Sequence, residues 1–263
     1  MQVVGVRRAL RFSPNNEEND LAILRAVVSP LGGIIVSEDS ERLPSALHSA
    51  DVVLSMARTS AALTLLDEAA SRGAQVINPA EGVRHCNRNA LYRLARQAGV
   101  PIPPADGEDG FWLKRADAAA QTRGDIVFCA NRHTLQQAIT AFHKRGVTDY
   151  LVQAHLCGDL VKFYGVLGTG FFRTFYPGDV GRSKFGDEVR NGRPQHYPFS
   201  VSALQTVAER LASATQCLVY GGDAIIGASG DFFLIDFNDW PSFSLCRTDA
   251  AAAIRQLVSS SCR

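Results

Sequence analysis

The sequence predicts an α/β lobe followed by an α+β region, on the strength of three observations. Strand-like and helix-like segments alternate over residues 1–80, which is typical of βαβ units and a parallel sheet. A proline- and glycine-rich stretch, "PIPPADGEDG", interrupts this alternation at residues 101–110. After it, several short strands follow one another closely, as they do in antiparallel sheets.

The first lobe is expected to be a small doubly wound sheet over residues 1–80. "MQVVGV" reads as a strand, "NDLAILRAVVSPLGG" has helical spacing that stops at glycine, and "GIIV" is the next short strand. The strand "ADVVLSMA", the helix "SAALTLLDEAASRG" and the strand "AQVIN" repeat the pattern. Such sheets bind ligands beyond the carboxyl ends of their strands, so "RRALRFSPNN" and "ARTS" are expected at a binding site.

Residues 81–263 are expected to form a second region, with a small central lobe at 81–150 and a C-terminal lobe at 151–263. "GVRHCNRNALYRLARQAGV" predicts one long helix ahead of the break. The central lobe then contains two strands and a helix, in "FWLKRA", "DIVFCA" and "HTLQQAITAFHKRG". The C-terminal lobe contains the strands "YLVQAHL", "LVKFYGVLG" and "FFRTFYP", a polar loop over 178–198, a helix over 200–216, a hairpin over 218–238 and a closing helix over 248–260.

The composition is that of an ordinary soluble globular protein, with 46% hydrophobic and 20% charged residues in a chain of 263. A formal charge of +1 argues against a nucleic-acid or membrane partner. The apolar runs are too short for a transmembrane helix, and the N-terminus lacks the pattern of a signal peptide.

The six cysteines have neither a metal-binding nor a disulfide spacing, so free thiols in a reducing compartment are expected. We therefore expect a cytoplasmic protein whose partner is a small-molecule substrate. A homodimer is compatible with the sequence.

The stretch "GGDAIIGASGDFFLIDFN" predicts a hairpin that gathers oxygen ligands. A turn at 228–230 brings Asp223 opposite the return strand, where Asp236 and Asn238 are two residues apart and share a face. Three oxygen ligands on one face suit a hard cation such as Mg²⁺. Solvent-facing hairpin charges are the alternative, but the apolar neighbours favour burial, where a carboxylate needs a partner or a metal.

Two lysines lie within apolar strands, Lys114 after "FWL" and Lys162 in "LVKFYGV". A lysine in such a strand either reaches the surface or meets an anion. Gln153 lies in the strand-like run "YLVQAHL", which is equally compatible with a plain core strand and with a strand whose backbone meets an adenine edge.

These segments resemble, in the same chain order, the motifs of the ATP-grasp superfamily. "VINPAEGVRHCNRNALYRLARQAGVPIPP" is similar to its strand, long helix and proline break, and "FWLKR" to its phosphate-binding lysine strand. "YLVQAHLCGDLVKFYGVLG" resembles its adenine hinge and following strand, and "GGDAII…FFLIDFNDWPSF" its metal-binding hairpin. The resemblance implies the ATP-grasp fold, in which ATP is sandwiched between two antiparallel-sheet lobes that follow the α/β lobe.

The same resemblance implies a nucleotide site. Lys114 and Arg88 would contact phosphates, and Lys162 would contact phosphate or substrate. The residues implied for the adenine pocket are Gln153, Ala154 and Leu156.

It also implies a metal and a catalytic set. Asp223, Asp236 and Asn238 would hold one or two Mg²⁺ ions, for which Mn²⁺ is an acceptable substitute. The catalytic candidates are Lys162 and Arg173, because cations neutralise charge that develops during phosphoryl transfer.

One segment departs from the superfamily pattern. Its phosphate-covering loop is often glycine-rich, whereas "RADAAAQTRGD" contains a single glycine. The side chains of Gln121, Thr122 and Arg123 are expected to replace the missing backbone contacts.

The sequence is compatible with three functions. The superfamily is dominated by carboxylate–amine (or thiol) ligases that act through an acyl phosphate, and this is the reading we favour. "IDFNDWPSF" is also similar to inositol phosphate kinases, which need a basic pocket. The basic residues available for such a pocket are Arg58, Arg173, Arg182, Lys184, Arg190 and Arg193. A nucleotide-binding protein without turnover is the third alternative.

Substrate contacts are expected where the first lobe meets the site. Ser13, Asn15 and Asn16 lie in "FSPNNEEND", although they are also ordinary turn and helix-capping residues. Arg58 begins a helix, where anions bind readily. The remaining substrate candidates are Arg182, Lys184 and Ser242.

Overall fold

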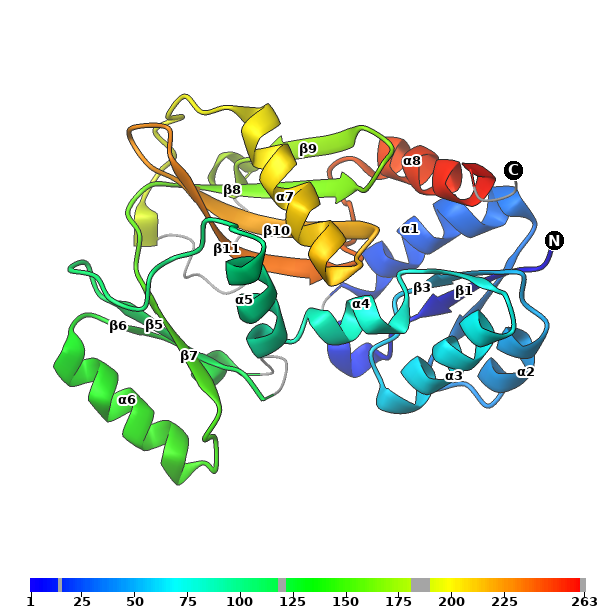
Figure 1. Ribbon diagram of the computed structural model, residues 1–263, viewed down its shortest axis with the longest axis horizontal. Coiled ribbons are helices and arrows are strands. Elements are labelled where there is room, and N and C mark those ends of the chain that lie inside the picture. Colours follow the sequence, from blue (N-terminus) through cyan, green and yellow to red (C-terminus); the bar gives the residue numbers. More distant parts are fainter. Residues whose placement is uncertain (14–15, 118–121, 181–189, 261–263) are drawn as a thin grey trace.

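The computed structural model describes residues 1–13, 16–117, 122–180 and 190–260, which form a parallel sheet and two antiparallel sheets (Figure 1). The predicted fold class is therefore confirmed. The parallel sheet lies at the right of Figure 1, and its strands come from residues before position 80. The predicted domain boundaries stay a prediction.

The parallel sheet has the strand order β2-β1-β3-β4. Its strands are β1 (Val3–Arg7), β2 (Ile34–Ser37), β3 (Val52–Ser55) and β4 (Gln75–Ile77). The connecting helices are α1 (Glu17–Val28), α2 (Leu43–His48) and α3 (Ser60–Ser71). Local signals set their ends: Gly32, at φ 70°, ends the turn after α1, and the Thr59 side chain accepts the N–H of Ala62 at 3.3 Å to cap α3.

The predicted long helix over 82–100 is wrong in one respect, because the segment forms α4 (Ala80–His85) and α5 (Arg88–Gln97). Asn87 has an extended backbone between them, and its side chain accepts the N–H of Asn89 at 3.1 Å. Asparagine favours this N-cap geometry over a helix interior. The break places Arg88 in the first turn of α5.

The smaller antiparallel sheet has the order β6-β5-β7. It consists of β5 (Phe111–Arg115), β6 (Ile126–Cys129) and β7 (Tyr150–Ala154), and α6 (Arg132–Lys144) covers one face. Leu113 packs against Phe142 and Val147 on that side. The alternating residues Trp112 and Lys114 therefore lie on the opposite face.

The larger antiparallel sheet has the order β11-β10-β8-β9. Its strands are β8 (Asp159–Val166), β9 (Phe171–Phe175), β10 (Val219–Ile226) and β11 (Phe232–Asp239), accompanied by a 3-10 turn at Pro177–Val180 and by α7 (Val201–Thr215) and α8 (Arg247–Ser260). One face packs on α7 through residues such as Phe163 and Tyr220. Tyr164, Val219 and Trp240 belong instead to the cluster that includes α1 and α8.

The C-terminal helix α8 joins the larger antiparallel sheet to the first lobe. Helix α8 lies along α1, as Figure 1 shows at the upper right. The sheet face that carries Lys162 and Asp223 therefore looks toward the junction of the lobes.

Candidate functional site

The hairpin of β10 and β11 places the predicted metal ligands together. Asp223 is the register partner of Asp236, and Gly221 is the partner of Asn238. The register shifts between Asp223 and Ala224, which leaves Ile235 as the extra residue of a bulge. Without this bulge, Ile235 would oppose Asp223, so the bulge is what turns Asp236 and Asn238 onto the face of Asp223.

Lys162 extends the same row across the sheet, because it is the register partner of Asp223 on β8. Its Nζ lies 2.5 Å from Asp223 Oδ1, while the Asn238 side-chain amide donates to Asp236 Oδ2 at 2.8 Å. Burial alone would lower the pKa of Lys162, but Asp223 reverses the effect and raises that pKa. The ammonium is therefore firmly charged beside the carboxylates.

The donor set fits a hard cation that takes its other ligands from phosphate and water. Two carboxylates and an amide lie on one face, and rotating the Asn238 amide would present its oxygen to a cation. In the described part of the chain, no group of three or more His, Cys, Asp or Glu side chains could hold a metal by itself.

Two basic residues approach the hairpin from the central lobe. Lys114 donates from Nζ to the carbonyl of bulge residue Ile235 at 3.1 Å, and Arg88 donates to the carbonyl of Arg115. Burial lowers the pKa of Lys114 to about 8, with Asp236 partly opposing the shift. Burial also lowers the pKa of Arg88. Partly desolvated cations of this kind gain most from an anionic ligand.

The predicted adenine segment forms the end of β7 and the residues just after it. Gln153 is 5% exposed, Ala154 donates its N–H to the Pro104 carbonyl at 2.7 Å, and the Leu156 carbonyl accepts from Asn191 at 3.1 Å. These hydrogen bonds hold the segment in place beside the sheet face that carries Lys114.

Arg58 lies at the start of α3, but protein carboxylates fill the anion positions around it. Glu38 Oε2 accepts the backbone N–H groups of Arg58 and Thr59 at 2.8 and 2.7 Å. The Arg58 guanidinium donates to Asp239 Oδ1 at 2.6 Å. Asp239 raises the pKa of Arg58 although burial opposes the change. Sequence reasoning missed both carboxylates, and a substrate contact for Arg58 stays a prediction.

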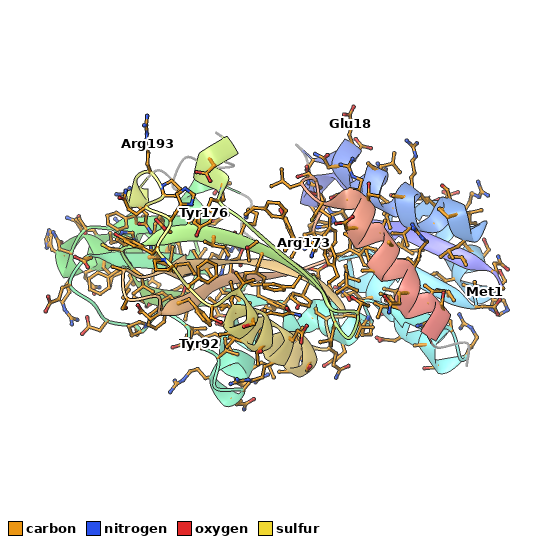
Figure 2. All side chains as sticks on the ribbon, turned by 90° about the horizontal axis from the view of Figure 1, so that it is seen from above. Met1, Glu18, Tyr92, Arg173, Tyr176 and Arg193 are labelled. Atoms are coloured by element: carbon orange, nitrogen blue, oxygen red, sulfur yellow. The ribbon has the colours of Figure 1, made fainter. Side chains whose placement is uncertain are left out.

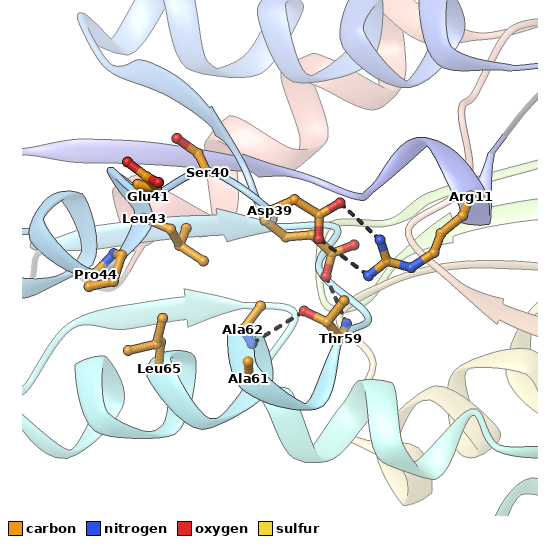
Figure 3. A pocket seen from close by; sticks show the side chains of 11 residues that line it. Arg11, Asp39, Ser40, Glu41, Leu43, Pro44, Thr59, Ala61, Ala62 and Leu65 are labelled. Atoms are coloured by element: carbon orange, nitrogen blue, oxygen red, sulfur yellow. Dashed lines mark hydrogen bonds and ion pairs between the residues drawn. The ribbon is translucent and has the colours of Figure 1, made fainter.

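A hollow of about 430 Å³ lies beyond this edge of the parallel sheet (Figure 3). Arg11 and Asp39 line it and are joined by two hydrogen bonds at 3.0 and 3.2 Å, and Leu43 and Leu65 are among the other lining residues. The Lys162 row does not line this hollow, which is therefore separate from the candidate site.

Arg173, the second catalytic candidate, lies on β9 near the centre of Figure 2 and pairs with Asp249 at 3.2 Å, so its catalytic role stays a prediction. Ser13 is buried, whereas Asn16 and Ser242 are partly exposed. The other candidates, Asn15, Arg182 and Lys184, lie outside the described residues.

The predicted phosphate-covering loop is described only in part. Gln121 and the side chain of Arg123 lie outside the described parts. Thr122 donates its N–H to Asp125 Oδ2 at 3.0 Å, and Asp125 also pairs with Arg145. Asp125 is 1% exposed, so the end of the loop is anchored by a buried carboxylate.

Free thiols and the absence of a transmembrane helix are expected from the sequence. Every cysteine in the described part is free, and Cys86 Sγ lies 3.4 Å from Cys217 Sγ. His155 accepts a hydrogen bond from the Trp112 indole at 3.2 Å. Among the described residues, none of the helices is long and apolar enough to span a bilayer.

No family model matches the chain, and none of the curated proteins matches it. Solved structures, however, match it over nearly its full length. The RimK domain protein ATP-grasp from Sphaerobacter thermophilus is 17% identical, with a TM-score of 0.65, and the match covers 98% of this chain and 100% of that one. D-alanyl-alanine synthetase A from Vibrio cholerae is 12% identical, with a TM-score of 0.66 and coverage of 99% and 98%.

D-cycloserine synthetase DcsG is also 12% identical, with a TM-score of 0.65 and coverage of 98% of this chain and 100% of that one. Identities this low establish the fold and not the reaction. The chain has the fold of the ATP-grasp superfamily, as the sequence motifs predicted.

Proposed function

We propose that this chain is a Mg²⁺- and ATP-dependent ligase that activates a carboxylate as an acyl phosphate and joins it to an amine or thiol. The observation that carries the proposal is the row formed by Asp236, Asp223 and Lys162 across the sheet. Lys114 reaches this row from the facing sheet. Oxygen ligands and lysines that converge from two sheets are what a metal-bound triphosphate requires.

The proposed reaction has two steps. A substrate carboxylate oxygen attacks the γ-phosphorus of ATP, the bond to ADP breaks, and an acyl phosphate forms. The amine nitrogen then attacks the acyl carbon, phosphate leaves, and the nitrogen loses a proton. Lys114 and Arg88 would hold phosphates in place, and Lys162 would neutralise charge that develops on the transferred group.

The cation would be held by Asp223, Asp236 and Asn238, and it would supply charge neutralisation between neighbouring phosphates. The adenine would bind along the segment that contains Gln153, Ala154 and Leu156.

The ligase is favoured over a kinase by the state of the basic residues. Two of the basic residues considered for an inositol phosphate pocket already pair with carboxylates, Arg58 with Asp239 and Arg173 with Asp249. Two structures that resemble the chain over its full length are named synthetases, for D-alanyl-alanine and D-cycloserine. These names support a substrate that carries a carboxylate and an amine.

The first experiment is a thermal shift with Mg²⁺ and ATP, on the wild type and on Asp236→Ala. A ligand at a hundred times its Kd stabilises a protein by about 2.7 kcal/mol. We expect a shift in the wild type that is lost in Asp236→Ala. The matched control is Asp231→Asn, which changes an exposed carboxylate of the same hairpin and should retain the shift.

ADP release then separates the functions. A ligase releases ADP only when a carboxylate and an amine are present together. Release with a single inositol phosphate or polyol would overturn the ligase in favour of a kinase. A thermal shift without ADP release across all acceptors would indicate a binding protein, and full activity of Asp236→Ala would remove the hairpin from the mechanism.

A further inference from the structure

An aromatic cluster lies on the face of the central sheet that also carries Lys114. Trp112 and Phe128 have ring centroids 5.3 Å apart, and His155 lies 5.3 Å from Phe128 and 6.1 Å from Trp112. The hydrogen bond from the Trp112 indole to His155 Nδ1 fixes the orientation of both rings. The three rings therefore form an ordered apolar wall and not a loose surface cluster.

The guanidinium of Arg190 covers part of this wall. Its Cζ lies 3.8 Å from the Phe128 ring centroid and 5.9 Å from that of Trp112. Such contacts are attractive because the ring face carries negative charge. Arg190 is itself exposed, so part of its side chain remains accessible to a ligand.

The chain around Arg190 is held beside the adenine edge. Asn191 donates to the Leu156 carbonyl at 3.1 Å. Further along, the backbone N–H groups of Gln195 and Tyr197 donate to the two carboxylate oxygens of Asp159, at 2.7 and 2.9 Å. Asp159 is 3% exposed, so this anchor is buried. Arg190 is consequently positioned before any ligand arrives.

The cluster lies at the correct spacing for a ligand that contacts Lys114. Trp112 and Lys114 are two residues apart on β5, which places their side chains on one face about 7 Å apart. A nucleotide whose phosphates contact Lys114 would thus place its base near Trp112 and Arg190. Planar bases stack on aromatic rings and on guanidinium planes alike.

We propose that Arg190 binds the nucleobase of the bound nucleotide by stacking on it, with Trp112 and Phe128 as the wall behind it. The inference rests on the proposed ATP site and adds a residue that contacts the base. The competing role is electrostatic, in which the Arg190 charge would attract the phosphates. Stacking needs the planar guanidinium, whereas attraction of phosphates needs only the charge.

Calorimetric titrations with Mg·ATP and with Mg·tripolyphosphate separate these roles, because tripolyphosphate lacks a base. In Arg190→Ala, we expect ATP to bind about tenfold more weakly and tripolyphosphate to bind as in the wild type. In Arg190→Lys, which keeps the charge, we expect the same loss of ATP affinity. Arg193→Ala is the control, since this neighbouring arginine points away from the molecule (Figure 2) and should change neither titration.

Several outcomes would overturn the inference. Unchanged ATP affinity in Arg190→Ala would remove Arg190 from the base site, and equal losses for ATP and tripolyphosphate with recovery in Arg190→Lys would establish the electrostatic role. If the wild type binds Mg·ATP no more tightly than Mg·tripolyphosphate, only the Arg190 inference fails. If the wild type binds neither ligand, the proposed function fails and Arg190 loses its role with it.

Tryptophan fluorescence provides a second measurement. Trp240 is fully buried in a different cluster, whereas Trp112 is partly exposed in the wall. ATP is expected to change the fluorescence of the wild type and to leave that of Trp112→Phe unchanged. Tripolyphosphate should leave both unchanged, and an equal response of the wild type to both ligands would contradict base stacking.

Discussion

Lys162 on β8 and Asp223 on β10 are direct cross-strand neighbours, and 2.5 Å separates the lysine Nζ from the carboxylate Oδ1. The lysine side chain is 30% exposed and the aspartate side chain 20%, so water screens the pair only partly. The ammonium therefore contacts the carboxylate that the proposed cation would use. A lysine and a divalent cation compete for one ligand in this arrangement.

This competition predicts opposite effects of Lys162→Met on metal binding and on turnover. Without nucleotide, Mn²⁺ affinity should rise by at least about fivefold, because removing a unit charge 4 Å away is worth about 1 kcal/mol even in water. Turnover should fall sharply, since the cation that neutralises the transferred group is lost. Mn²⁺ binding measured by electron paramagnetic resonance checks the first effect, with Lys144→Met on exposed α6 as the control. An unchanged or weaker Mn²⁺ affinity would contradict the competition.

The pKa of Lys114 predicts a pH dependence of nucleotide binding. Burial lowers that pKa to about 8, so the ammonium form prevails below pH 8 and the neutral amine above it. Phosphate binds the charged form, so the affinity for Mg·ATP should be nearly constant below pH 8 and should fall as the pH rises above it, approaching tenfold per unit. Titration calorimetry from pH 7 to pH 9.5 measures the profile. Lys114→Arg keeps its charge in this range and should remove the decline. A flat wild-type profile would contradict a contact between the Lys114 ammonium and the phosphates.

Part of the geometry of the metal hairpin could be predicted from the sequence. The spacing of Asp236 and Asn238 predicted a shared face, because side chains on a strand alternate with a period of two. The turn position predicted that Asp223 lies roughly opposite this pair, and Asp223 is the register partner of Asp236 because of the bulge at Ile235. The bulge at Ile235 was not foreseen, because nothing in "FFLIDFN" distinguishes a bulged strand from a regular one.

The carboxylate partners of Arg58 could not be predicted from the sequence, for a different reason. The expectation of an anion at the start of α3 was physically sound, since backbone N–H groups there need an acceptor. The acceptor is Glu38, which follows β2, and the guanidinium partner Asp239 ends β11. These contacts join segments far apart in the chain, so no local pattern predicts them. By contrast, the helix break at Asn87 had a local signal, an asparagine that favours the N-cap.

The charges around Arg58 do not cancel. Arg8 lies 3.2 Å from Asp20, and Arg58 lies 2.6 Å from Asp239, with Glu38 close to both arginines. Two guanidinium groups thus face three carboxylates, which leaves one net negative charge in a mostly buried cluster. Loss of a cation and loss of an anion should therefore have unequal effects on stability.

Arg58→Met raises the net charge of the cluster to two negatives and leaves Asp239 buried without its guanidinium, so the free energy of unfolding should fall by about 3 kcal/mol. Asp239→Asn neutralises the cluster and keeps an oxygen that accepts from Arg58, so the loss should be about 1 kcal/mol. The exposed pair of Arg173 and Asp249 gives the control, because Asp249→Asn should cost less than about 1 kcal/mol. Urea denaturation of the three variants measures the order, and a larger loss for Asp239→Asn than for Arg58→Met would show that the excess negative charge does not govern this cluster.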